Sequence, residues 1–124
     1  MTYLAYAVGH LHPVAPVDED VFRYIELIQA TMDPYGGAFL VHGKQVEVKE
    51  GEWPGAFVLI GFPDIERARA WYASEAYQEI LPLRTRAFTA DILLVEGVAP
   101  GYDAAATAAG MRAAGTGAAA GREA

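Results

Sequence analysis

The sequence contains no cysteine and a single serine. The absence of cysteine excludes disulfide bonds, thiolate zinc sites and cysteine nucleophiles. The one serine, Ser74, lies outside a Gly-x-Ser-x-Gly setting, which argues against a serine hydrolase. Long hydrophobic runs are also missing, because no apolar stretch approaches the roughly 18 residues that a membrane span requires. The pair Gly36-Gly37 is too short to cradle a phosphate and has no lysine after it, so nucleotide binding is disfavoured.

Basic residues are scarce as well. Nine Lys and Arg stand against sixteen Asp and Glu, which gives a formal net charge of -7. A chain this acidic repels phosphate backbones and anionic lipid surfaces, so we expect neither nucleic-acid binding nor membrane attachment. The first residues, Met1-Thr2-Tyr3, lack the basic and apolar regions of a signal peptide, and we therefore expect a cytoplasmic protein.

Large apolar side chains become rare after residue 97. Residues 98–124 are dominated by alanine and glycine and contain no Leu, Ile, Phe or Trp. Such a segment cannot bury enough apolar surface to offset the entropy of ordering it. We predict one domain over residues 1–97, followed by a flexible Ala/Gly-rich tail over residues 98–124 with a transient helix around 103–114.

Hydrophobic periodicity changes several times within the predicted domain. Continuous or alternating apolar runs predict strands, and apolar residues at helical spacing predict helices. Asp18 and Asp64 mark helix starts, and Pro82 is expected to kink or restart the last helix. The predicted extended segments are 3–12, 38–42, 45–49, 56–62 and 89–96, and the predicted helices are 18–32, a segment after Asp64 and a segment after Ser74. This order predicts an α+β fold, a ferredoxin-like βαββαβ unit with a four-stranded antiparallel sheet.

Both helices of such a fold cover the same face of the sheet. On the first strand, neither the Tyr3, Ala5, Ala7 set nor the alternating Tyr6 and Val8 set is polar in the way that a solvated face would be. An uncovered apolar sheet face is normally an interface, so we expect a homodimer formed by sheet-on-sheet packing. The alternative is a monomer whose tail folds across that face.

Several short motifs in this order resemble one known family. They are Tyr35-Gly36-Gly37-x-Phe39-Leu40-Val41, Val46-Glu47-Val48, Glu52-Trp53-Pro54, Phe62-Pro63, Ala68-x-Ala70-Trp71-Tyr72-x-Ser74 and the segment Tyr77 to Arg84. The chain is similar to the domain-of-unknown-function family thirteen-thirty within the dimeric α/β-barrel superfamily. The resemblance spans residues 3–97 and implies a ferredoxin-like subunit and a dimer, without an established reaction. Relatives in the superfamily include cofactor-free monooxygenases, muconolactone isomerase-type enzymes and haem-handling proteins, so fold does not determine function. Members of the family often carry Arg directly after Tyr-Gly-Gly, whereas this chain has Ala38, so no anion-binding role is transferred to that position.

Two histidines, His10 and His12, point the same way because strand side chains alternate. Such a pair is the geometry of a strand-borne metal site, for which the third ligand would have to be His42 or Glu47. His42 precedes a turn glycine and is expected to be exposed. The favoured interpretation involves no metal and no other cofactor. In it, His10 alone acts as an acid or base, since imidazole titrates near neutral pH.

Arg84 and Tyr35 complete the predicted catalytic set. The Arg84 guanidinium would hold a substrate carboxylate or enolate bidentately, and Tyr35 would help to stabilise the developing negative charge. The alternative for Arg84 is a salt bridge to one of the many carboxylates of the chain.

Aromatic residues are numerous for so small a domain and suit a pocket for a flat, partly apolar ligand. The predicted substrate-binding residues are Tyr6, Tyr24, Phe39, Trp53, Trp71, Tyr72 and Tyr77. Two functions stay open. One is a cofactor-independent enzyme, of isomerase, cyclase or monooxygenase type, acting on a small aromatic or unsaturated carboxylic or carbonyl compound. The other is a non-catalytic dimer that binds a small molecule or serves in a stress response.

Overall fold

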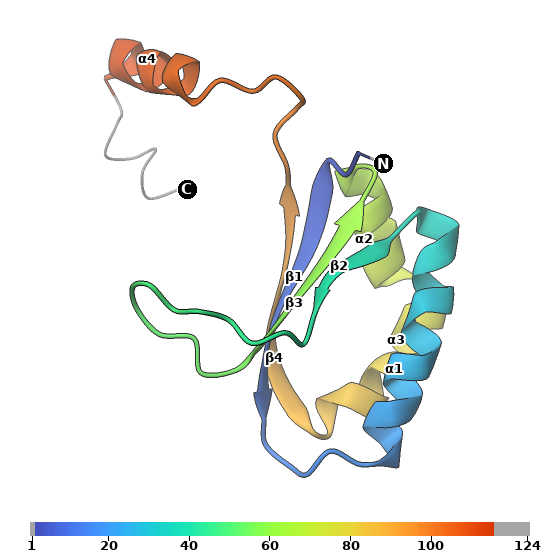
Figure 1. The fold of residues 1–124 in the computed structure, drawn as a ribbon. Helices are drawn as coiled ribbons and strands as arrows, with labels where there is room; N and C mark the ends of the chain where they lie inside the picture. The colour runs from blue at the N-terminus through green and yellow to red at the C-terminus, as the bar shows by residue number, and fades with distance from the viewer. Residues whose placement is uncertain (1, 116–124) are drawn as a thin grey trace.

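The structure, a computed structural model, describes residues 2–115 and contains one four-stranded sheet. The strands lie in the order β2-β3-β1-β4, and every neighbouring pair is antiparallel. The elements are β1 (Ala5–Pro13), α1 (Glu19–Met32), the 3-10 turn η1 (Asp33–Tyr35), β2 (Ala38–His42), β3 (Ala56–Phe62), α2 (Ile65–Ala73), α3 (Glu75–Thr85), β4 (Phe88–Glu96) and α4 (Ala104–Ala114). Figure 1 shows α1, α2 and α3 together on one side of the sheet. The predicted ferredoxin-like α+β fold is confirmed, with the second helix divided into α2 and α3.

Side-chain caps explain where the helices begin. The Asp18 carboxylate accepts hydrogen bonds from the backbone N–H groups of Asp20 and Val21, and Asp64 accepts one from Arg67 at 2.8 Å. The hydroxyl of Ser74 donates to the Trp71 carbonyl that ends α2. The same oxygen accepts from the Tyr77 N–H, which begins α3. These bonds satisfy backbone groups that a helix end leaves without partners.

One predicted extended segment is wrong. Residues 45–49 form no strand and belong to the loop between β2 and β3, which projects away from the helices (Figure 1). Alternation of Val46 and Val48 with polar residues stabilises a strand only where one side is buried and a neighbouring strand is available. Here β2 occupies the free edge of β3, and Val48 is exposed.

The core lies between the sheet and the three helices. Ala5 and Ala7 of β1 are buried and small, which leaves room for large side chains. The largest fully buried side chains are Tyr77, Phe62 and Met32. Gly37 is required beside them, because a Cβ atom there would lie 2.6 Å from the Phe62 ring.

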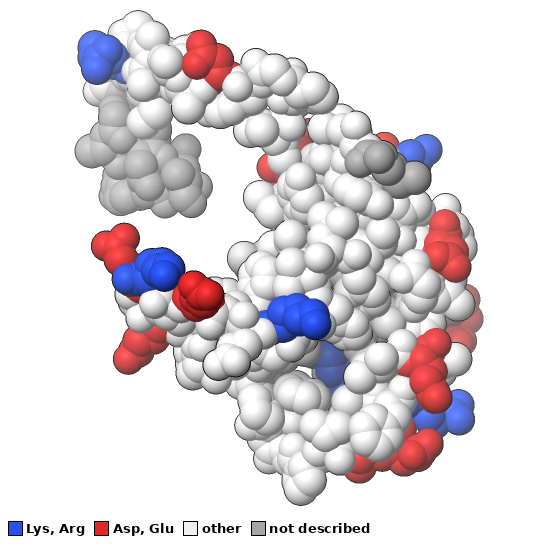
Figure 2. Space-filling view, in the orientation of Figure 1, with Lys and Arg blue, Asp and Glu red and all other residues white. Residues whose placement is uncertain are grey.

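The other face of the sheet is left uncovered by residues 2–115 and is largely apolar. On β4 it presents Leu93 and Val95, which are 59% and 47% exposed. Figure 2 shows charged groups concentrated over the helices and on the loop between β2 and β3, with a mostly uncharged surface between them. We name the face of the sheet opposite α1, α2 and α3 the open face; from the strand register it comprises Tyr6, Val8, His10, His12, Phe57, Leu59, Asp91, Leu93 and Val95.

The segment after β4 forms α4, a helix that stands away from the sheet (Figure 1). Helix α4 therefore covers almost the same residues as the transient helix predicted around 103–114. The remainder of the predicted tail, residues 116–124, lies outside the described residues. Within residues 2–115, no helix is long and apolar enough to cross a bilayer.

Candidate functional site

A cavity of about 110 Å³ lies between the helix-covered face of the sheet and helices α1 and α3. Its walls are almost entirely apolar or aromatic, with a few polar groups contributed by the helices and β2. Residues that line it include Gly9, Leu11, Tyr24, Ile25, Ile28, Phe39, His42, Val58, Ile60, Trp71, Tyr77, Arg84, Phe88 and Ile92. An apolar hollow with a small number of polar groups is the usual form of a small-molecule site.

The floor of the cavity is the backbone of β1 at Gly9. A Cβ atom at this position would lie 3.4 Å from Cδ1 of Ile92 and 3.6 Å from Cβ of Val58, within the space that glycine leaves open. The hollow therefore exists partly because β1 carries no side chain at Gly9.

Arg84 provides a buried positive charge at the cavity wall. It lies in the last turn of α3 and is only 5% exposed. Its guanidinium carbon lies 5.7 Å from the centre of the Tyr24 ring, a cation–π contact. Among residues 2–115, no carboxylate lies within 4.0 Å of this guanidinium, whereas Arg86 is paired with Asp20 at 2.8 Å. The predicted alternative, a salt bridge from Arg84, is therefore not found in the described chain.

Two tyrosines lie next to Arg84. The hydroxyl oxygens of Tyr24 and Tyr77 are 2.8 Å apart and share a hydrogen bond. Burial raises the pKa of Tyr24 far above its ordinary value, and the neighbouring Tyr77 raises it further. Tyr24 is therefore a neutral phenol at physiological pH and can donate a hydrogen bond.

His42 is the one histidine that lines the cavity, and residue spacing did not point to it. Its ring stacks on Phe39 with centroids 4.2 Å apart. In a regular strand, residues three apart face opposite ways. A bulge between Phe39 and Val41 shifts the register, so that Phe39 pairs with Ile60 and His42 with Val58, both on the cavity side. His42 is exposed, as predicted, and it lies at the solvent side of the cavity.

The structure separates the predicted site residues into three groups. Arg84, Tyr24, Phe39, Trp71 and Tyr77 line the cavity. Tyr35 and Tyr72 pack against the core without lining it. His10, Tyr6 and Trp53 lie on the open-face side of the sheet.

The expectation that His10 and Arg84 share one cavity is wrong. Gly9 and Leu11 of β1 face the helices, so alternation directs His10 to the opposite face. The His10 ring stacks instead on Trp53, with centroids 3.8 Å apart. An acid–base role for His10 toward a compound held by Arg84 is excluded by this placement, because the sheet lies between them.

The antiparallel βαββαβ sheet, with its helices on one face and a cavity beneath them, defines a ferredoxin-like fold. The chain belongs to the family described as a domain of unknown function (DUF1330), whose model matches residues 4–98. No curated protein matches the chain.

Solved structures share the fold at low sequence identity. A protein of unknown function from Rhodopseudomonas palustris is 14% identical with a TM-score of 0.60, over 79% of this chain and 85% of that one. A dimeric ferredoxin-like protein of unknown function from Jannaschia is 15% identical with a TM-score of 0.53, over 75% and 98%. An antibiotic biosynthesis monooxygenase is 22% identical with a TM-score of 0.50, over 77% and 99%. These similarities establish the fold.

Proposed function

We propose that the cavity binds a small organic anion that has an apolar, ring-sized body and a carboxylate or enolate group. The observation that carries this proposal is Arg84, a buried cation that no carboxylate of the described chain neutralises. A buried charge is costly without a partner. An Arg84 guanidinium without a carboxylate partner, at the wall of an apolar cavity, is consistent with a ligand that itself carries the counter-ion.

The other cavity groups fit the same ligand. A guanidinium binds a carboxylate through two parallel hydrogen bonds, and the Tyr24–Tyr77 pair has a hydroxyl proton left to donate. Apolar cavities of roughly 150 Å³ accept a benzene ring. At about 110 Å³ this cavity is smaller, so it suits a short unsaturated chain, or a single ring that extends toward solvent past the exposed His42.

Matched probes test this function. Benzoate and its neutral analogue benzamide have the same body and differ in charge, so thermal-shift and tryptophan-fluorescence titrations should show tighter binding of benzoate. Arg84→Gln should remove that preference, since a charge-assisted hydrogen bond is worth about 1.5–3 kcal/mol, or roughly 10–150-fold in affinity. The control is Arg86→Gln, two residues along and paired on the surface with Asp20. Equal binding of both probes, or a preference for benzoate that survives in Arg84→Gln, would contradict the proposal.

A second candidate function is proton transfer to or from the bound compound. The observation that favours it is His42, an imidazole in the same cavity as Arg84. Imidazole exchanges protons near neutral pH, and a nearby guanidinium stabilises an enolate. We test it by following deuterium incorporation next to the carbonyl of phenylpyruvate in D₂O by NMR. His42→Gln should slow incorporation by roughly 10²–10⁴-fold. If phenylpyruvate binds but deuterium exchange is not catalysed, proton transfer is contradicted and only the binding function is supported.

We also propose that two copies associate through the open face. Its exposed Leu93 and Val95 form part of an apolar surface, the kind of surface that oligomers bury. The similar protein from Jannaschia is described as dimeric. An interface of the usual size buries about 800 Å² per partner.

Absence of nucleic-acid binding and a cytoplasmic location stay predictions from the sequence, which a filter-binding assay and cell fractionation would test.

A further inference from the structure

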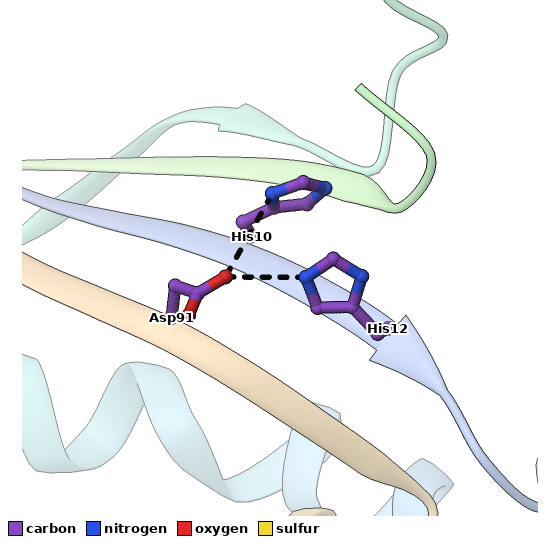
Figure 3. Close-up of side chains that lie close together, drawn as sticks. All are labelled: His10, His12 and Asp91. Atoms are coloured by element: carbon purple, nitrogen blue, oxygen red, sulfur yellow. Dashed lines mark hydrogen bonds and ion pairs between the residues drawn. The ribbon is translucent and has the colours of Figure 1, made fainter. Parts of the chain in front are cut away.

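Two histidines and an aspartate converge on the open face, on the side of the sheet opposite the cavity. His10 and His12 project from the same face of β1, and Asp91 of β4 is the register partner of His10 (Figure 3). Oδ2 of Asp91 lies 3.2 Å from Nε2 of His12 and 3.9 Å from Nδ1 of His10. One ligand atom from each residue lies within 4.8 Å of the other two.

We propose that His10, His12 and Asp91 bind a divalent transition-metal ion of the Zn²⁺ or Ni²⁺ class. Metal–ligand bonds of about 2.0–2.2 Å place neighbouring donor atoms roughly 3–4 Å apart. The distances from Asp91 Oδ2 to both imidazoles match this spacing. Two imidazole nitrogens and a carboxylate oxygen suit zinc, nickel and iron better than the all-oxygen-binding Mg²⁺ and Ca²⁺.

Neighbouring groups already hold the His10 ring in place. The Trp53 indole stacks on it at 3.8 Å, and the backbone N–H of Gly55 donates to its Nε2 at 3.0 Å. That hydrogen bond puts the proton of the neutral metal-free ring on Nδ1. A metal bound at Nδ1 displaces this proton to Nε2, so the Gly55 N–H must turn away. Metal binding therefore moves the end of the β2–β3 loop and changes the surroundings of Trp53.

This site is independent of the proposed ligand cavity. Its three protein ligands leave positions on the metal for water or another donor. Asp91 is largely exposed in a single copy, so an ion can reach it from solvent before two copies associate through the open face. Failure of metal binding would not affect the function proposed for Arg84, and failure of anion binding would not affect the metal site.

The test uses the full chain without a polyhistidine tag. We expect calorimetry with Zn²⁺ to give one ion per chain, and Ni²⁺ to quench part of the tryptophan fluorescence. His12→Gln and Asp91→Asn should each weaken Zn²⁺ binding by roughly tenfold or more. The matched control is His42→Gln, which removes the third histidine from the other side of the sheet. Trp53→Phe should abolish most of the quenching while calorimetric binding persists, because the remaining tryptophan, Trp71, is buried in the core.

Circular dichroism confirms that each variant is folded before binding is compared. The proposal is overturned if the wild-type chain takes up no Zn²⁺ at about millimolar concentration. It is equally overturned if folded His12→Gln and Asp91→Asn bind as tightly as the wild type, or if His42→Gln weakens binding as much as they do.

Discussion

Tyr24 of α1 and Tyr77 of α3 are joined through their hydroxyl groups, whose oxygens lie 2.8 Å apart beside Arg84. Each hydroxyl has one proton, so one of them donates to the other and the second retains a proton for another acceptor. The pair thus links two helices and also supplies a hydrogen-bond donor next to the buried cation.

This arrangement predicts a loss of stability at alkaline pH. Burial and Tyr77 raise the pKa of Tyr24 in the folded chain, whereas the unfolded side chain ionises near pH 10. Between these two values the unfolded state loses a proton that the folded state keeps. The stabilisation is therefore complete below about pH 10 and declines as the pH rises further, by up to about 1.4 kcal/mol per pH unit.

Urea unfolding between pH 8 and pH 11 measures this slope. Tyr24→Phe should unfold with a shallower decline above pH 10, because it lacks the titrating group. Tyr102→Phe is the control, since Tyr102 is exposed on the segment before α4 and should leave the slope unchanged. Identical slopes in the wild type and Tyr24→Phe would refute the prediction.

Arg84→Met should separate stability from ligand binding. The substitution removes a desolvated charge that has no carboxylate partner in the described chain, and it also removes a cation–π contact worth about 0.5–2 kcal/mol. These effects oppose each other, so we expect the free energy of unfolding to stay within about 1 kcal/mol of wild type or to rise. Binding of benzoate should be lost. Destabilisation by several kcal/mol would instead show that Arg84 is needed for folding.

The Thr31 hydroxyl is the hydrogen-bond acceptor for the buried indole N–H of Trp71. The Trp71 N–H donates to the Thr31 hydroxyl at 3.0 Å, and that hydroxyl donates to the Ile28 carbonyl. Thr31→Val keeps the shape and leaves the indole N–H without a partner, which should cost about 1–3 kcal/mol in urea unfolding. Thr31→Ser retains the hydroxyl and should cost less. The reverse order would indicate that methyl packing, rather than hydrogen bonding, matters at this position.

Leu93→Glu should break the proposed dimer without unfolding the subunit. Leu93 is 59% exposed on the open face, so a carboxylate there is hydrated in the monomer and buried in a dimer. Sedimentation at micromolar concentration should give a dimer for the wild type and a monomer for this variant. Phe22→Glu changes an apolar residue on α1 that is 50% exposed, and this variant should remain dimeric. A monomeric wild type would refute sheet-on-sheet association.

Removal of residues 98–124 should have little effect on the fold. Gly97, whose N–H donates to the Leu4 carbonyl at 2.7 Å, is kept, while the excised α4 stands away from the sheet. We expect the melting temperature to change by a few degrees at most, corresponding to about 1 kcal/mol for a domain of this size. Loss of dimerisation in the truncated chain would show that the tail contributes to the interface.

Local patterns in the sequence predicted most of the elements but not the partners of each side chain. Residues 18–32 contain both an apolar helical stripe and the capping Asp18, and they form α1 almost as predicted. Residues 45–49 have an equally clear alternation, yet they form no strand, because neither set of alternating side chains is buried against the sheet and Val48 is exposed. Periodicity reports which way a side chain points along one element and contains no information about neighbouring strands.

Both candidate sites depend on which strands lie next to each other, and the periodicity of the sequence does not contain that information. Alternation placed His10 and His12 together correctly, but Asp91, which is 79 residues from His12 in the chain, joins them only through the register between β1 and β4. His42 reaches the cavity because of a bulge at Leu40, which no residue pattern marked. Arg84 was predicted as an anion-binding group or as half of a salt bridge, and the sequence could not show that the described chain places no carboxylate beside it.

Gly9 offers evolution and the protein engineer a means of changing ligand size at one position. The contacts of 3.4–3.6 Å that a Cβ atom would make there are ordinary van der Waals distances, so alanine fits and shortens the hollow by about one methyl group. A branched side chain would reach Ile92 and Val58 and close the floor altogether. Glycine and alanine codons differ by a single nucleotide. Arg84 can therefore be inherited unchanged while a substitution at residue 9 alters the length of the compound that the cavity accepts.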